Sequence, residues 1–506
     1  MLRVAAIDLG ASSGRVLTGE YAAGELTITP VNRFTNGPVF VPRSGGTDLV
    51  WDILSLWNGI RCGLLEASHA GPLDSVGIDT WGVDYGLLDS DGRIISNPAS
   101  YRSDRTSPAV AHLHKSIAPT ALYAANGIQF QPFNTLYQLL ADQSESYSAR
   151  ATTVLLLPDL ITYWLTGQQI CEVTNASTTG LLDPRTRTWN PTILELLQNQ
   201  GVRVPQILTH LTEPGVAVGP ISVPECDIRT AQGTPTPLIT VGSHDTASAV
   251  VAVPAPGAVA ARRSSGASFG FISSGTWSLV GIELDAPVLS EKSRQANFTN
   301  ELGVDGTVRY LKNIMGMWVQ QELLRELREC GEAEVSWEVL DRETEAAPAF
   351  RSMFDINDPS FAAPGAMRER IDSACVSAGF PVPRCRGEYL RAITESLVIA
   401  YRRALREATD LSGTSIQTVH IVGGGSKNRL LCQLTADAVD LPVVAGPVEG
   451  TAMGNMVVQL RALGAVSGTL DDLRAIIACS VTTTTYEPHT RTSTWDEVEA
   501  ALFNRA

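Results

Sequence analysis

One pattern occurs twice in this chain of 506 residues: an apolar strand, a turn of very small residues and a second apolar strand. The first copy covers residues 3–21, with its turn at residues 11–14, and the second covers residues 268–283. The two halves are not obviously similar in sequence, so the repetition is one of architecture. It predicts an α/β protein of two lobes, each with its own small-residue hairpin.

The segments after the first hairpin also read as regular α/β structure. Residues 25–31 predict a third strand, and residues 52–65 predict a helix because apolar residues recur every three or four positions. Asp52 precedes this helix as an N-cap. The expected order is therefore strand, strand, strand, helix, strand.

Three consecutive glycines mark a strand-to-helix turn late in the chain. Residues 417–444 read as strand, triple glycine, helix and strand, and glycines there allow a ligand to approach the backbone closely. The spacing is not G-x-G-x-x-G, and the chain has no G-x-x-x-x-G-K-[ST] loop. Dinucleotide-dependent oxidoreductases and Walker-type ATPases are therefore disfavoured, whereas a nucleotide in a cleft between two hairpin-bearing lobes fits the pattern.

The chain is long enough for about three average domains or two large ones. A loop-like stretch at residues 250–265 predicts a boundary between two of them. We expect an N-terminal lobe over residues 1–250, a C-terminal lobe over residues 265–465 and a C-terminal extension over residues 466–506.

Charge and cysteine usage disfavour several classes of protein. A net charge of −15 and a pI near 5.0 disfavour non-specific binding to nucleic acid or to an anionic membrane, since both attract clustered positive charge. The eight cysteines contain no C-x-x-C pair and predict reduced thiols. No signal-peptide pattern and no apolar run of about 18 residues occurs, so we expect a soluble, cytoplasmic protein.

One carboxylate, Asp245, follows a β-rich apolar stretch and has very small neighbours within residues 241–250. Such a carboxylate can accept a proton from a hydroxyl group. The same residue could instead cap the helix that residues 246–249 predict. The residues alone leave both interpretations open.

Seven motifs follow one another between residues 7 and 425. They are Ile7-Asp-Leu-Gly-Ala-Ser-Ser-Gly-Arg-Val16, Ile78-Asp-Thr-Trp-Gly-Val-Asp84, Gln131-Pro-Phe-Asn-Thr-Leu-Tyr-Gln138, Ser243-His-Asp-Thr-Ala-Ser248, Ser274-Gly-Thr-Trp-Ser278, Leu311-Lys-Asn-Ile-Met-Gly-Met-Trp318 and His420-Ile-Val-Gly-Gly-Gly425. In this order they resemble the FGGY family of carbohydrate kinases, and within it they are most similar to the rhamnulokinases. The resemblance implies two actin-like (ribonuclease H-like) lobes with an interlobe nucleotide and sugar cleft.

For the nucleotide, the resemblance implies that the first hairpin turn binds the phosphates of ATP through Ala11, Ser12, Ser13, Gly14 and Arg15. Thr276 of the second turn is expected to contact phosphate, and Gln321 and Gly424 are expected to lie along the nucleotide. Asp8 is expected to hold Mg²⁺ through water, as a hard oxygen ligand does. Capping the turn is an alternative role for the Asp8 carboxylate.

For the sugar, the resemblance implies contacts from Gly82, His244, Asp245, Thr246 and Asn313, with Trp81 as a wall for the C–H faces. Asp245 is the expected catalytic base. Trp81 could instead be a plain core residue, and His244 could be a structural histidine.

Two departures from the rhamnulokinase pattern matter. Extra residues occur around residues 258–269, before Thr276 and at the connection between the lobes. In the segment 101–105 the acid, Asp104, stands one position later than expected, so we leave it out of the site.

The expected activity is ATP-dependent phosphorylation of L-rhamnulose at C1, giving L-rhamnulose 1-phosphate and ADP, in L-rhamnose catabolism. The alternatives are another ketose kinase of the family, L-fuculokinase or xylulokinase, and an actin-like ATPase that acts as a nucleotide switch on a protein partner. The expected partner is a small ketose, without nucleic acid or membrane, and the protein is expected as a monomer or small homo-oligomer. ADP release that requires sugar would distinguish the kinases from the switch.

Overall fold

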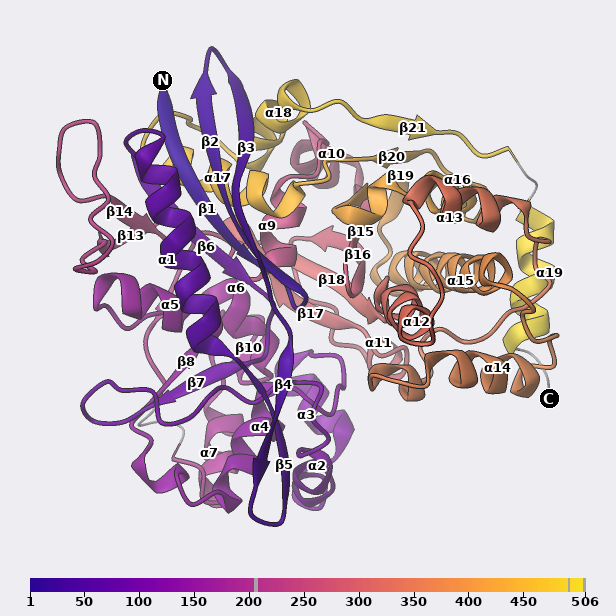
Figure 1. Ribbon diagram of the computed structural model, residues 1–506, viewed down its shortest axis with the longest axis horizontal. Helices are drawn as coiled ribbons and strands as arrows, with labels where there is room; N and C mark the ends of the chain where they lie inside the picture. The colour runs from indigo at the N-terminus through magenta and orange to yellow at the C-terminus, as the bar shows by residue number, and fades with distance from the viewer. Residues whose placement is uncertain (204–207, 490–491, 504–506) are drawn as a thin grey trace. The chain divides into compact units, whose positions relative to one another are not determined.

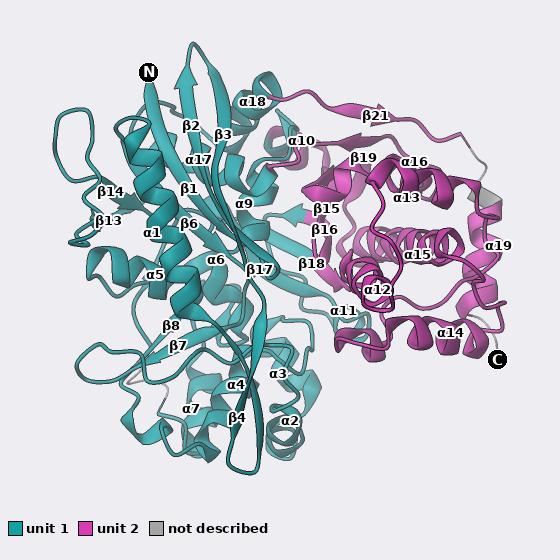
Figure 2. Ribbon diagram, in the orientation of Figure 1, with its two compact units in different colours: residues 1–259, 283–310, 450–480 teal, residues 260–282, 311–449, 481–506 magenta. Residues whose placement is uncertain are grey.

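The computed structural model describes residues 1–203, 208–489 and 492–503. The chain forms two compact units (Figure 2). Unit 1 consists of residues 1–259, 283–310 and 450–480, and unit 2 consists of residues 260–282, 311–449 and 481–506. Neither unit is one continuous stretch of chain.

Unit 1 is built on a six-stranded sheet in the order β13-β14-β6-β1-β2-β3 (Figure 1). Alternate residues of a strand point to opposite faces of the sheet. On β2, Val16 packs against Gly63 of α1, and Gly19 packs against Met456 of α17, so these helices cover opposite faces. The elements of this layer are β1 (Leu2–Leu9), β2 (Ser13–Ala22), β3 (Glu25–Thr35), β6 (Ser75–Thr80), β13 (Ala217–Pro220), β14 (Pro237–Ile239), α1 (Ile53–His69), α9 (Asp245–Val251), α17 (Gly450–Ala462) and α18 (Leu470–Ser480).

A second part of unit 1 lies between β6 and β13 in sequence and has its own apolar core, which includes Leu136, Leu156 and Leu181. α11 (Glu291–Gln295) and β17 (Thr299–Leu302) contact this part through α3 and α6. Its other elements are β7 (Tyr85–Leu88), β8 (Thr153–Leu156), β9 (Cys171–Glu172), β10 (Leu182–Asp183), β11 (Thr188–Trp189), β12 (Leu211–Thr212), α2 (Ser107–Leu113), α3 (Pro119–Asn126), α4 (Thr135–Ala141), α5 (Leu157–Thr166), α6 (Val173–Ala176) and α7 (Pro191–Asn199).

Unit 2 is built on parallel strands β15, β19 and β20, with β16 and β21 as antiparallel partners. Its longest helix, α15, packs against α12, α13 and α16 and supplies much of the core. The elements that lie wholly or partly in this unit are β15 (Ala267–Ser274), β16 (Ser278–Leu284), β18 (Val308–Ile314), β19 (Ser415–Val422), β20 (Val443–Ala445), β21 (Thr484–Tyr486), α10 (Ala258–Ser265), α12 (Trp318–Glu329), α13 (Trp337–Ala346), α14 (Met367–Ser377), α15 (Arg386–Ser412), α16 (Arg429–Val439) and α19 (Thr492–Phe503).

The predicted α/β class is confirmed, and the two predicted hairpins are β1–β2 and β15–β16. The predicted N-cap is also confirmed, because Asp52 Oδ1 accepts a hydrogen bond from the Ser55 amide (3.1 Å). The expected order of elements lacks one hairpin that the structure contains. Between β3 and α1 the chain forms a hairpin, β4 (Pro38–Arg43) and β5 (Gly46–Trp51), closed by a two-residue loop in which Gly45 has a φ of 81°.

The interlobe stretch also differs from the expectation. Residues 258–265 form the helix α10 and not a loop, because most of them are Ala and Arg, which favour helix. The amide of Val259, in its first turn, donates to Asp471 Oδ1 (2.9 Å), which satisfies one of the free donors at the helix start.

All eight cysteines are unpaired thiols, four of them buried. Among the described residues, no helix combines the length and the apolar character needed to cross a membrane. The domain limits predicted from the sequence are continuous segments, whereas each of the two units consists of three segments of the chain. The predicted limits stay a prediction.

Candidate active site

The β1–β2 turn is held by backbone hydrogen bonds and by one asparagine. The Gly10 amide donates to the Ser13 carbonyl (2.9 Å), and the Asn36 side chain donates to the Gly10 carbonyl (2.7 Å). A Cβ on Gly14 would lie 2.2 Å from the ring of Phe34, so only glycine fits there. The predicted phosphate-binding residues 11–15 therefore share one well-fixed turn of unit 1.

Asp8 lies at the end of β1 beside two charged residues. Its buried carboxylate forms an ion pair with Arg15 on β2. Asp79 lies in register with it on the parallel strand β6 and accepts a hydrogen bond from Asn455 Nδ2 (2.6 Å). Burial, and after it the charge of Asp8, raises the pKa of Asp79 well above its usual range. Two carboxyl groups thus lie in register at the ends of β1 and β6, and their proximity and burial favour the protonated form of Asp79.

These carboxylates suit a hydrated divalent cation. Oδ1 of Asp79 is buried and has no hydrogen-bond partner among the described residues. Within the same residues, no group of three or more metal-ligating side chains could hold a metal ion by itself. Mg²⁺ retains several waters and binds through one or two carboxylates together with substrate phosphates. Asp8 therefore fits the predicted role of a ligand that acts through water.

Trp81 and Gly82 directly follow β6. Trp81 is 7% exposed, and a Cβ on Gly82 would lie 2.8 Å from Thr178 Oγ1, which explains the glycine. The next residue, Val83, has a φ of 69°, a left-handed conformation that β-branched residues rarely adopt. The Thr135 hydroxyl donates to its carbonyl (2.7 Å) and helps to hold this conformation. Backbone strain of this kind is concentrated at functional sites.

Asp84 fixes the aromatic side chains of this region. Its Oδ2 accepts hydrogen bonds from the indoles of Trp51 (2.7 Å) and Trp81 (3.1 Å) and from the Tyr101 amide (3.2 Å), and its Oδ1 accepts one from Gln138 (2.9 Å). The two indole rings lie 4.4 Å apart between centroids. Burial raises the pKa of Asp84 to about 6 in spite of the four donors. One buried carboxylate thus orients both indoles.

Asp245 is the first residue of α9. Its Oδ1 accepts hydrogen bonds from the amide (2.6 Å) and the hydroxyl (3.2 Å) of Thr246, while its side chain remains 33% exposed. The preceding residue, His244, is the N-cap and is buried. Asp245 is therefore not the N-cap of α9: its Oδ1 accepts hydrogen bonds from the residue that follows it, and Oδ2 can receive a proton.

Glu172 holds the chain that leads into α9. Its buried carboxylate accepts hydrogen bonds from the amide (3.1 Å) and hydroxyl (2.6 Å) of Ser243, and from the amide (2.9 Å) and hydroxyl (2.6 Å) of Thr174. Burial raises the pKa of Glu172. The sequence did not single out this residue, which precedes Ser243 by 71 positions and belongs to none of the seven motifs.

In unit 2, Thr276 lies in the turn between β15 and β16. The Trp318 amide, at the start of α12, donates to the Thr276 carbonyl (3.0 Å). Gly316 has a φ of 57°, and a Cβ there would lie 2.4 Å from the Trp277 carbonyl carbon, so the two segments approach closely. Gln321 is exposed in the first turn of α12. Thr276 and Gln321 thus belong to adjoining elements.

The three glycines after β19 differ in their surroundings. Gly423 has a φ of 84°, and a Cβ on Gly425 would lie 2.0 Å from Ser274 Oγ. A Cβ on Gly424 would meet nothing within 4 Å. The backbone at Gly424 therefore has open space beside it, which its predicted role along the nucleotide requires.

The predicted residues are divided between the units. Unit 1 contains Asp8, Ala11, Ser12, Ser13, Gly14, Arg15, Trp81, Gly82, His244, Asp245 and Thr246, and unit 2 contains Thr276, Asn313, Gln321 and Gly424. Asn313, on β18, is the one predicted sugar residue that belongs to unit 2. Asp104, which we left out of the site, is exposed.

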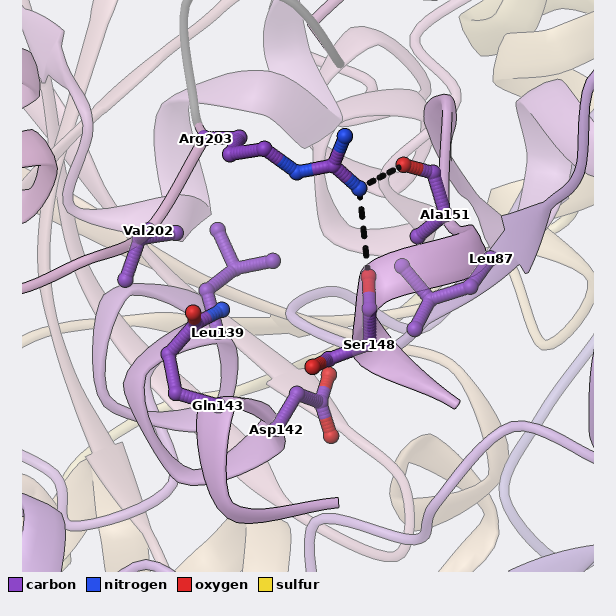
Figure 3. Close-up of a pocket in the computed structure, with 8 residues that line it drawn as sticks. All are labelled: Leu87, Leu139, Asp142, Gln143, Ser148, Ala151, Val202 and Arg203. Atoms are coloured by element: carbon purple, nitrogen blue, oxygen red, sulfur yellow. Dashed lines mark hydrogen bonds between the residues drawn. The ribbon is translucent and has the colours of Figure 1, made fainter. Parts of the chain in front are cut away.

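A small pocket in unit 1, part of it open to solvent, contains none of these residues (Figure 3). Arg203 at its rim donates to the carbonyls of Ala151 (2.6 Å) and Ser148 (3.3 Å), and Asp142 pairs with Arg105. Its lining is Leu87, Leu139, Asp142, Gln143, Ser148, Ala151, Val202 and Arg203. The charged groups there already have protein partners, so we do not include this pocket in the candidate site.

Solved structures with the same fold are kinases of small molecules. The xylulose kinase from Lactobacillus acidophilus superposes with a TM-score of 0.76 at 16% identity, covering 100% of this chain and 97% of its own. The glycerol kinase from Plasmodium falciparum, solved with ADP, gives 0.75 at 15% identity, covering 99% and 97%. The chain therefore has the fold of the two-lobed α/β kinases.

The sequence comparisons go further than the fold. Models of the FGGY family of carbohydrate kinases match this chain over residues 63–252 (N-terminal domain) and 270–463 (C-terminal domain). Rhamnulokinase from Enterococcus faecalis is 40% identical over 481 residues, which are 94% of this chain and 91% of the relative. Rhamnulokinase from Bacteroides thetaiotaomicron is 39% identical over 494 residues, 97% and 96% of the two chains. The chain belongs to the FGGY family of carbohydrate kinases and is a phosphotransferase.

Proposed function

We propose that this enzyme phosphorylates L-rhamnulose at its C1 hydroxyl, with ATP as donor, giving L-rhamnulose 1-phosphate and ADP. Identity of about 40% to proteins named rhamnulokinase, over nearly the whole chain, supports the sugar assignment. The unpaired cysteines support a reducing, cytoplasmic location. The observation that carries the chemistry is the position of Asp245 as the first residue of α9, with Oδ1 held by Thr246 and the side chain still 33% exposed.

Asp245 is the proposed base. Oδ1 is engaged by Thr246, so Oδ2 receives the proton of the C1 hydroxyl. The hydroxyl oxygen bonds to the γ-phosphorus of ATP while the bond from that phosphorus to the β–γ bridging oxygen breaks, and ADP leaves. Phosphoryl transfer depends mainly on alignment and on neutralised charge. The hydrogen bonds that Ser243 donates to Glu172 serve this alignment, because they fix the backbone one residue before the His244 N-cap.

The phosphates of ATP are proposed to bind at the two hairpin turns. The amides of residues 11–15 and the hydroxyl of Thr276 supply donors for phosphate oxygens. Gln321 and the open backbone at Gly424 are proposed to line the rest of the nucleotide. Asp8 would hold Mg²⁺ through water, and the bound ion would neutralise charge on the transferred phosphoryl group.

The ketose is proposed to contact both polar and aromatic groups. Gly82, His244, Thr246 and Asn313 are the proposed polar contacts, and Trp81 is the proposed wall for the C–H faces. The Trp81 indole is held by Asp84, which limits the orientations that the wall can take. A pocket of this kind recognises a sugar by the positions of its hydroxyl groups.

A panel of ketoses tests the substrate assignment. L-rhamnulose, L-fuculose and D-xylulose are compared by sugar-dependent ADP formation, with a no-sugar control for ATP hydrolysis. We expect the highest kcat/KM for L-rhamnulose and little ADP without sugar. Faster turnover of L-fuculose or D-xylulose would replace the proposed sugar but retain the family. A rate of ADP release that is the same with and without each of the three sugars would contradict the assignment as a kinase of these ketoses.

The variant Asp245→Asn tests the base. Asparagine keeps the shape of the side chain but cannot take the proton, so we expect kcat to fall about 10²–10⁴-fold. The sugar Kd, measured by calorimetry, is expected to change far less. If kcat stayed near normal and only sugar binding weakened, Asp245 would be a positioning residue and the base would lie elsewhere.

A further inference from the structure

A buried group of charged side chains lies behind His244, on the side away from Asp245. Arg309 on β18 is fully buried, and its Nη1 lies 2.9 Å from Nδ1 of His244 and 3.0 Å from Oε2 of Glu301 on β17. Oε2 of Glu301 also lies 3.2 Å from His244 Nδ1. On the other side of the ring, His244 Nε2 lies 3.4 Å from Oδ1 of Asp245.

The two neighbours of Nδ1 demand opposite protonation states of the imidazole. A guanidinium has only N–H donors, so a hydrogen bond from Arg309 requires a lone pair on Nδ1. A carboxylate only accepts, so a hydrogen bond to Glu301 requires a proton on Nδ1. A neutral imidazole carries one proton, and the tautomer is therefore decided by which neighbour bonds to Nδ1.

The geometry favours Arg309 as the partner of Nδ1. The contact of 2.9 Å between Nη1 and Nδ1 meets the criteria of a hydrogen bond. Oε2 of Glu301, in contrast, accepts no aligned hydrogen bond from the described residues. Burial raises the pKa of Glu301, but the Arg309 guanidinium, and after it His244, bring it below its usual value, so Glu301 serves as the countercharge of Arg309.

Arg309 itself has little freedom to move away from His244. Its Nε and Nη2 both donate to the Leu302 carbonyl (3.2 and 3.1 Å), and Nη2 also reaches the Thr174 carbonyl (3.4 Å). These bonds hold the guanidinium plane while Nη1 points at the ring. The arrangement is a preformed donor and not a flexible surface cation.

We propose that Arg309 and Glu301 are positioning residues that hold His244 in the Nε2–H tautomer, so that His244 presents a donor toward Asp245 and the sugar. The opposite tautomer would place a bare nitrogen lone pair beside the Asp245 carboxylate. His244 Nε2 and the Asp245 carboxylate would then compete for the proton of the substrate hydroxyl, and the ketose would lose the hydrogen bond that the Nε2–H group can donate. The inference rests on the proposed function, since it takes Asp245 as the base.

The tautomer can be read directly by NMR on the intact enzyme. The chain has seven histidines, so ¹⁵N-histidine labelling gives a small set of ring signals, and the variant His244→Gln identifies those of His244. The tautomers are compared at alkaline pH, where the ring signals of His244 no longer change with pH. We expect His244 to show a protonated Nε2 and a bare Nδ1. A protonated Nδ1 in the wild-type enzyme would overturn the proposal.

Variants separate the roles of the two neighbours. In Arg309→Met only Glu301 remains beside Nδ1, so we expect the proton of His244 to move from Nε2 to Nδ1. In Glu301→Gln the guanidinium remains, so we expect the tautomer to persist while thermal stability falls, because Arg309 loses its countercharge. Arg461→Met is the matched control, since it removes an arginine of unit 1 that pairs with Asp305 at the surface.

Kinetics add a second readout. In Arg309→Met we expect kcat/KM for the ketose to fall about 10–100-fold, as for other groups that orient a functional side chain, with the KM for ATP unchanged. Arg461→Met should match the wild type in kcat/KM for the ketose and in KM for ATP. An equal fall of kcat/KM for the ketose and for ATP in Arg309→Met would indicate a general structural defect and would contradict the proposal. If Asp245→Asn retained turnover while His244 showed Nε2–H, the proposed base would fail and the tautomer assignment would stand.

Discussion

Asp84 shows how a single buried carboxylate can orient two indole side chains and still oppose folding. It accepts four hydrogen bonds, two of them from the indoles that it orients. Its burial nevertheless raises its pKa from the ordinary value of 3.8 to about 6. A carboxyl group that binds its proton more tightly in the folded chain stabilises the fold when protonated and destabilises it once ionised.

We therefore expect the stability of Asp84→Asn relative to the wild type to depend on pH. Between the unfolded pKa of 3.8 and the folded pKa of about 6, the folded wild type retains a proton that the unfolded chain loses. Its free energy of unfolding falls as pH rises through this window, whereas asparagine does not titrate. The difference in free energy of unfolding should shift in favour of Asp84→Asn by about 2 kcal/mol between pH 4 and pH 7. Urea unfolding at a series of pH values measures it, and a constant difference would disprove the assigned shift.

Thr276 gives a second prediction for a single side chain. Valine has the same shape but no hydroxyl, and a hydrogen bond to a charged group contributes about 1.5–3 kcal/mol. We expect Thr276→Val to raise the KM for ATP about tenfold or more and to leave the KM for the ketose nearly unchanged. Thr29→Val, an exposed threonine on β3, is the control. A change in the ketose KM alone would move Thr276 from the nucleotide to the sugar.

Some candidate site residues could be recognised from the residues next to them in the sequence, and others could not. Asp245 was recognisable because it follows an apolar strand and precedes small residues, and Gly424 because it lies in a run of three glycines. Glu172 and Arg309 gave no such signal. Each acts on the chain around His244 from a position more than 60 residues away, through contacts that only the tertiary fold creates.

At the scale of elements, the placement of α9 depends on its close contact with α17. A Cβ on Gly454 of α17 would lie 1.8 Å from the carbonyl oxygen of Ser248 in α9, so the helices meet at their backbones. α9 begins with Asp245, and its position along α17 therefore fixes where the carboxylate lies.

We expect Gly454→Ala to separate the two helices. The added methyl group should cost about 1–3 kcal/mol of stability through overpacking. A displacement of about 1 Å at Asp245 can lower kcat by about 10²-fold. Thermal unfolding and steady-state kinetics measure the two effects. Gly37→Ala, where an added Cβ meets nothing within 4 Å, is the control, and equal behaviour of the two variants would show that the contact has no role in catalysis.

The elements that were missed from the sequence share a physical cause. The hairpin β4–β5 has an exposed face, on which Phe40 is 67% exposed, so its sequence lacks the pattern of buried apolar residues that predicts a strand. Helix α10 was taken for a loop because of its flanking proline and glycine residues, although its own alanines and arginines favour helix. Strands β1 and β15 were predictable because continuous apolar runs end in small-residue turns.

At the scale of the whole molecule, the last 26 residues, 481–506, belong to unit 2. β21 pairs with β20 at the edge of the sheet, and the Trp495 side chain is 1% exposed against Phe350. Asp496 and Glu499 of α19 pair with Arg402 of α15, whose side chain is 8% exposed. This segment covers an edge strand and neutralises a nearly buried cation.

Truncation after Ser480 should therefore destabilise unit 2 first. Without α19, Arg402 loses both carboxylates, and β20 becomes an exposed edge that can pair with other chains. Limited proteolysis followed by mass spectrometry should find the first new cleavages within residues 311–449. Removal of residues 504–506 alone is the control. If the first cleavages fell in residues 1–259, the segment would not stabilise the unit to which it belongs.

The interleaving of the units also bears on how the chain is made. The sheet around β1 and β2 is covered on one face by α17, which is synthesised after nearly all of unit 2. About 190 residues separate position 259 from position 450, so at about 5–20 residues per second that face waits roughly 10–40 s on the ribosome without its cover. Unit 1 therefore cannot complete its fold until residues 450–480 have been synthesised. A gene cut between the two family domains would encode an N-terminal fragment in which one face of the β1–β2 sheet is uncovered, and exposed apolar surface of this kind is bound by chaperones.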